Sequence, residues 1–71
     1  MASGAPARAL VVLRVARGAP VPTDADLRVA LAADRKRLGL PANEPFVCRC
    51  AGPYAVEVAG RAVDEYVAWE V

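Results

Sequence analysis

Apolar and polar positions follow their most regular pattern over residues 23–41, where the spacing predicts one amphipathic helix. Leu27, Leu31 and Leu38 fall within a narrow arc when this stretch is drawn as a helix, and Ala30 lies at the edge of that arc. Because these side chains are apolar and the other positions are mostly polar, we expect the arc to face the core.

Both ends of this helix carry local signals. Thr23 and Asp26 form a variant of the capping box, in which each side chain can accept a hydrogen bond from the other residue's backbone N–H. Gly39 can take the left-handed conformation after the last turn, and Pro41 cannot continue a helix. We therefore expect the helix to begin after Thr23 and to end before Gly39.

Asp34 falls inside the apolar arc and is a possible buried acid. A carboxylate on such a face must be paired, hydrogen-bonded or protonated if it is buried. We expect Asp34 to lie near the rim of the core and to pair with an arginine such as Arg14 or Arg49. The alternative is that Asp34 is a partner-binding or acid/base group.

Other segments have the β-branched content and the alternation that favour strands. Residues 8–17 are apolar on both faces, so we expect a strand inside the sheet rather than at its edge. Residues 46–51 and 54–59 are expected to form a hairpin closed by the loop Ala51 to Pro53. Residues 62–71 favour a strand by composition, although a helix also fits their pattern.

The turn before the last segment sets its expected register. A two-residue turn at Gly60-Arg61 places Glu57 opposite Asp64. Because these like charges would face each other, we expect a bulge or a helical turn near Asp64 and Glu65.

These elements predict a single small α+β domain over residues 8–71, with the order β-α-β-β-β. One amphipathic helix is expected to pack on a mostly antiparallel four-stranded sheet, and residues 1–7 are expected to form a disordered tail. This order and size are similar to those of small regulatory or inhibitor proteins of phages and mobile elements, a likeness of architecture alone.

Length and composition narrow the class of protein. A chain of 71 residues that is 56% hydrophobic should fold, but it is near the size at which one core is only just sufficient. We therefore expect a homodimer or another homo-oligomer, or a larger protein partner. A net charge of +1 gives no general attraction to nucleic acid or to anionic membrane.

The sequence has no apolar run long enough to span a membrane and no export signal at its start, so we expect a cytoplasmic protein with no membrane partner. Its abundance of Ala, Val and Arg, with no Ile, Gln or His, is typical of a GC-rich bacterium or phage.

Catalysis has little support in the residues present. The chain has no His, its one Ser lies in the expected tail, and its one Thr is used as the helix cap. Cys48 and Cys50 have no third Cys or His with which to complete a zinc site. We expect these two to be buried thiols of the core, and we expect no catalytic residue, no metal and no cofactor.

Two groups of side chains are candidates for partner binding. The helix carries basic residues that could contact phosphates or an acidic protein, namely Arg28, Arg35, Lys36 and Arg37. Tyr54, Tyr66 and Trp69 could anchor a protein interface. Each group also has a purely structural interpretation, because basic residues complement the C-terminal end of a helix and aromatic residues fill a core.

The first functional hypothesis is therefore a non-enzymatic module that binds a larger protein, such as a phage or mobile-element inhibitor or regulator of a bacterial complex. It would dock through the sheet face or edge that carries Tyr66 and Trp69, or through the basic side of the helix. The second is a dimeric nucleic-acid-binding regulator that uses the local basic patch. The third is a small structural subunit of an assembly.

Overall fold

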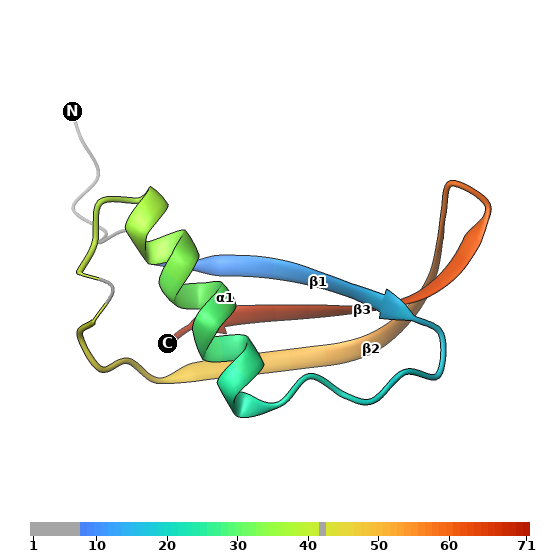
Figure 1. Ribbon diagram of the computed structural model, residues 1–71, viewed down its shortest axis with the longest axis horizontal. Coiled ribbons are helices and arrows are strands. Elements are labelled where there is room, and N and C mark those ends of the chain that lie inside the picture. Colours follow the sequence, from blue (N-terminus) through green and yellow to red (C-terminus); the bar gives the residue numbers. More distant parts are fainter. Residues whose placement is uncertain (1–7, 42) are drawn as a thin grey trace.

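The structure is a computed structural model that describes residues 8–41 and 43–71, and it is a small α+β fold. Its elements are β1 (Leu10–Ala16), α1 (Asp24–Arg37), β2 (Cys48–Val58) and β3 (Arg61–Glu70). The strands form an antiparallel sheet in the order β1-β3-β2, and α1 lies across one face of it (Figure 1). Over the described residues there are three strands rather than the expected four. The expected tail, 1–7, lies outside these residues.

Both ends of the helix lie where the sequence signals predict. The Thr23 hydroxyl accepts from the Asp26 N–H at 3.1 Å, and the Asp26 carboxylate accepts from the Thr23 N–H at 3.0 Å, which completes the capping box. At the other end Gly39 has a positive φ of 79°, and the Leu40 N–H donates to the Arg35 carbonyl. This closing pattern satisfies carbonyls of the last turn that would otherwise lack a partner.

The expected hairpin at Ala51 to Pro53 is wrong, because β2 runs straight through this segment. Ala51 pairs with Val67 and Tyr54 pairs with Glu65, so Gly52 and Pro53 together stand opposite a single residue of β3. This is a bulge in an edge strand, which is a position where a residue with no backbone N–H is tolerated.

The hairpin that does form joins β2 to β3 through the turn Ala59-Gly60, both of which have positive φ. This turn lies one residue earlier than expected, so Glu57 stands opposite Ala62 rather than opposite Asp64. The expected bulge in the last strand is therefore unnecessary, and the bulge lies in β2 instead. Asp64 is buried, and its carboxylate accepts from the Gly18 N–H at 3.1 Å and pairs with Arg17 at 3.0 Å.

The core lies between α1 and the end of the sheet that holds the last residues of β3. Leu27 and Leu31 of α1 are buried against Ala9 and Ala68, and Val11, Leu13, Phe46 and Cys48 pack around them. β3 is the central strand, and β1 lies at an edge of the sheet, contrary to the expectation from its apolar faces. None of the described helical residues form a span long and apolar enough to cross a membrane.

Candidate functional site

The face of the sheet opposite α1 carries apolar side chains that no described element covers, and we call it the open face. Side chains alternate along a strand, so the neighbours of the core residues Val11 and Leu13 must point to this other side. It is formed from all three strands, with these large apolar members: Leu10, Val12, Tyr54, Val56, Val58, Val63, Val67 and Trp69.

The register brings these side chains into adjacent rows. Leu10 of β1 stands opposite Trp69 of β3, and Val12 stands opposite Val67. Leu10 and Val12 are 56% and 47% exposed, and Tyr54 on the other edge strand is 50% exposed. Exposed apolar residues scattered singly are ordinary, whereas a contiguous patch is typical of an interaction site.

The charged groups of the open face are few. Arg14 pairs with Glu65 across β1 and β3, with Nε 3.0 Å from Oε2. Because the Arg14 side chain is 55% exposed, this pair contributes little stability, about 0–1 kcal/mol. Arg49 stands opposite Trp69, and no salt bridge among the described residues includes it. Arg61, which stands opposite Val58, lies on the same face, and no salt bridge among the described residues includes it. The open face therefore presents an apolar area with one neutralised pair and two additional positive charges.

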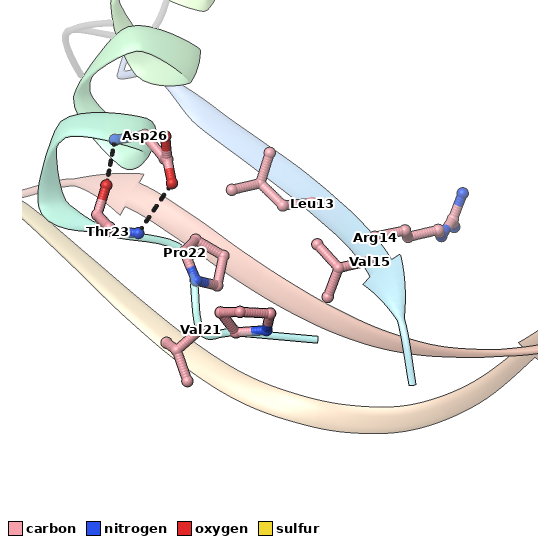
Figure 2. A pocket seen from close by; sticks show the side chains of 8 residues that line it. Leu13, Arg14, Val15, Val21, Pro22, Thr23 and Asp26 are labelled. Atoms are coloured by element: carbon pink, nitrogen blue, oxygen red, sulfur yellow. Dashed lines mark hydrogen bonds between the residues drawn. The ribbon is translucent and has the colours of Figure 1, made fainter. Parts of the chain in front are cut away.

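A cavity of about 330 Å³ lies on the other side of the sheet, between β1 and the loop that leads into α1 (Figure 2). Its walls include Leu13, Val15 and Val21, and its polar lining includes Thr23 and Asp26. Figure 2 shows that these two polar residues bond to each other. The cavity therefore has a mostly apolar lining, and the side chains of Thr23 and Asp26 in its wall are both engaged in the helix cap.

Arg35, predicted to bind a partner, is buried and only 5% exposed. Its Nη1 donates to Glu70 Oε2 at 2.6 Å, its Nε donates to the Pro41 carbonyl at 3.0 Å, and its guanidinium lies over the Phe46 ring. The hydrogen bond from Arg35, with a further one from the Ala9 N–H, holds the pKa of Glu70 below its ordinary value. These contacts tie the helix to the end of β3.

Asp34 lies near the rim of the core and pairs with an arginine, as expected, but this arginine is Arg37 rather than Arg14 or Arg49. The carboxylate accepts from the Leu10 N–H at 3.0 Å and pairs with Arg37 at 2.8 Å. The backbone hydrogen bond, with that from Arg37, lowers the pKa of Asp34. Asp34 is thus an ionised group with its partners inside the chain, and its carboxylate covers one N–H at the edge of the sheet.

Most of the basic residues that the sequence predicts as a patch on the helix have partners within the chain. Arg28 donates to Asp24 at 2.7 Å and to the Phe46 carbonyl at 2.7 Å, and its hydrogen bond to Asp24 raises its pKa. Arg35 points inward and Arg37 pairs with Asp34. Lys36 is exposed and lies between the two.

The aromatic candidates are divided between the two faces of the sheet, and Tyr54 lies on the open face. Tyr66 is 2% exposed and lies on the side of α1, whereas Trp69 is half-buried on the open face. The two cysteines also differ, because Cys48 packs against the core and Cys50 is exposed, contrary to the expectation that both are buried.

Leu10 and Val12 are the surface residues that sequence reasoning missed, whereas Tyr54 is one of its aromatic candidates. The signal was present, because the first strand is apolar on both faces, and an edge strand with two apolar faces leaves one of them uncovered. The open face is accordingly the structural feature from which a function can be argued. In comparisons with known proteins, no family model, no curated protein and no solved structure matches this chain.

Proposed function

We propose that this chain is a non-enzymatic protein-binding module that docks on a larger protein through the open face of its sheet. The observation that carries the proposal is the exposure of Leu10, Val12 and Tyr54 beside the half-buried Trp69. Covering such a surface contributes about 25 cal/mol for each Å² of apolar area removed from water, and this contribution offsets the cost of association. An inhibitor or regulator of a bacterial complex is a narrower form of this proposal.

The side chains of the open face also indicate the chemistry of the partner. Trp69 and Tyr54 are large, rigid residues of the kind that contribute most to protein interfaces. Arg49 lies beside Trp69 and is exposed, so a partner with an acidic group at this rim would be favoured over one with a basic group. We expect the partner surface to be broad and apolar, with a carboxylate opposite Arg49.

A nucleic-acid-binding role for the helix has weaker support. The predicted basic patch needs Arg35 and Arg37 to be available, but Arg35 is buried and Arg37 pairs with Asp34. Phosphate binding depends on several accessible cations acting together. The aliphatic residues of the open face likewise favour a protein over nucleic acid.

The test is capture from a lysate of the source organism, with native mass spectrometry of the captured complex. Leu10→Glu and Tyr54→Glu each place a charge on the open face. The matched control is Val29→Glu, which places the same charge on the outer side of α1, where Val29 is 72% exposed. Circular dichroism of each variant confirms folding before capture.

We expect a stoichiometric, nuclease-resistant complex with one larger protein for the wild type and for Val29→Glu. The two open-face variants should lose at least nine-tenths of the captured partner, because a charge would be buried without a counter-charge. A complex that survives in both open-face variants, or one that nuclease treatment removes, would overturn the proposal.

A further inference from the structure

β1 lies at an edge of the sheet, and the register shows which of its backbone groups point away from β3. The Glu70 N–H donates to the Ala9 carbonyl at 2.9 Å, so Ala9 faces β3. Backbone groups of successive residues in an antiparallel pair point alternately toward and away from the neighbouring strand. The backbone groups of Leu10, Val12, Arg14 and Ala16 therefore point outward.

Two of these outward groups have partners within the chain. The Leu10 N–H donates to Asp34 Oδ2 at 3.0 Å, and the Ala16 carbonyl accepts from the Ala19 N–H at 2.9 Å. Six groups remain with no hydrogen bond to any described residue: the carbonyl of Leu10, both groups of Val12, both groups of Arg14 and the N–H of Ala16. An edge with such a row of free groups is a template for another strand.

We propose that a second copy of this chain pairs with β1, antiparallel, about a two-fold axis at Leu13. In this register Val12 of each copy faces Arg14 of the other, and the two residues exchange both backbone hydrogen bonds. The Ala16 N–H of each copy also meets the Leu10 carbonyl of the other. All six free groups of each copy then have partners.

The two outward backbone groups of β1 that already have partners explain why a second copy of this chain fits the edge. The Leu10 N–H and the Ala16 carbonyl would stand opposite each other, and neither needs a bond because Asp34 and Ala19 satisfy them. A shift of the register by two residues in either direction would leave free groups unpaired. The edge is thus complementary to itself in one register, as a two-fold interface requires.

Side chains in this register are also compatible. Leu13 would meet Leu13 of the second copy on the side of α1, and Val12 would meet Arg14 on the open face. No like charges would lie directly opposite each other, and Arg14 could keep its pair with Glu65. Antiparallel pairing within one sheet places both helices on the same side, so the two open faces would join across a six-stranded sheet.

The join would double the docking surface of the proposed function; this consequence rests on that function, whereas the pairing itself does not. If the wild-type chain captures a partner but stays monomeric, the dimer proposal alone is overturned. If it dimerises but captures no partner, the proposed function alone is overturned.

The test is the molar mass of the full chain by sedimentation equilibrium, at concentrations up to about 0.5 mM because a one-strand interface is small. Val12→Pro removes one outward N–H, which an edge strand tolerates in the folded monomer. Glu57→Pro is the matched control, because its N–H points outward at the other edge of the sheet. Circular dichroism confirms that both variants fold.

We expect the wild type and Glu57→Pro to approach twice the chain mass of 7.4 kDa, and Val12→Pro to remain at 7.4 kDa. A wild type that stays monomeric, or a Val12→Pro variant that still dimerises, would overturn the proposal. Hydrogen exchange of the wild type gives a second readout that needs no variant. The Val12 and Arg14 amides should exchange at least tenfold more slowly at high than at low protein concentration, and an unchanged rate would contradict the proposed register.

Discussion

Two carboxylates join the helix to the sheet, and both are held in their charged form. The pKa of Glu70 lies below its ordinary 4.5 because of the hydrogen bond from Arg35, and that of Asp34 lies below its ordinary 3.8 because of the Leu10 N–H. The unfolded chain therefore binds protons more readily than the folded chain in acid. The stability that these groups contribute is fully present above the ordinary values and is lost as the pH falls through the lowered ones.

We expect the free energy of unfolding, measured by urea denaturation, to be nearly constant from pH 7 to pH 5.5. It should begin to decline below the ordinary pKa values of 4.5 and 3.8 and should continue to fall through the lowered pKa values of the folded chain. The control is the double variant Glu70→Gln and Asp34→Asn, which should be less stable at pH 7 and should lose less stability between pH 5.5 and pH 3. Equal losses in wild type and double variant would show that other groups govern acid unfolding.

Gly52 is the residue whose replacement should distort the sheet most directly. Its φ is +124°, and a Cβ there would lie 2.7 Å from the Glu65 carbonyl oxygen and 3.1 Å from a ring carbon of Tyr66. Backbone strain of about 1–3 kcal/mol and overpacking of about 1–3 kcal/mol should both act in Gly52→Ala. We expect thermal or urea unfolding to show a loss of about 3 kcal/mol.

The matched control is Gly18→Ala, because Gly18 also has a positive φ, of +83°, but has no atom within 4 Å of the added Cβ. Strain of the left-handed backbone is then the only cause of destabilisation, and it should lower the free energy of unfolding by about 1–2 kcal/mol. If the two variants lose the same stability, the close approach of β3 to Gly52 contributes nothing.

The inward position of Arg35 shows what residue patterns could and could not predict. Leu27, Leu31 and Arg35 are spaced by four residues, so the helical pattern places Arg35 beside the buried leucines. Its partner Glu70 lies 35 residues away in the chain, and nothing local indicates that pairing. The interpretation of residues 35–37 as a surface patch followed from their charge alone.

At the scale of elements, α1 is attached to the sheet by few large side chains. Leu31 is fully buried, whereas Val29 on the same helix is 72% exposed. Truncating a buried leucine usually costs about 2–5 kcal/mol, and a chain of this size has a total stability of about 4–10 kcal/mol. We expect Leu31→Ala to lower the free energy of unfolding by about 2–5 kcal/mol, as measured by urea denaturation followed by circular dichroism.

Val29→Ala is the control for this prediction, because it shortens an exposed side chain of the same helix. It should change the free energy of unfolding by less than about 0.5 kcal/mol. Similar losses in the two variants would mean that α1 does not depend on the packing of Leu31.

The elements differ in how far local sequence determines them. The helix ends were predictable because the capping box at Thr23 and the closing Gly39 act within a few residues. The course of β2 was not, since Gly52-Pro53 has turn chemistry, and only pairing with β3 shows that it is a bulge. The order of the strands likewise depends on contacts between distant residues, and it decides which apolar face remains open.

At the scale of the whole molecule, one helix and one sheet make two layers, and the shortest dimension of the chain is 17 Å. The second face of the sheet has no layer of its own within the described residues. Small domains bury a low fraction of their surface and often depend on association for stability. A partner would bury the open face, and a second copy would pair with the free edge at β1, so each association would add to the stability of the chain.

The edge pairing predicts that thermal stability depends on protein concentration. In a folded dimer, each tenfold rise in concentration adds about 1.4 kcal/mol per dimer, or about 0.7 kcal/mol per chain. For a chain of this length, that corresponds to a rise in Tm of about 3–5 °C. Differential scanning calorimetry should show this rise for the wild type and Glu57→Pro, and no rise for Val12→Pro. A Tm that is independent of concentration in all three would contradict pairing at β1, while equal slopes in all three would place the association elsewhere on the molecule.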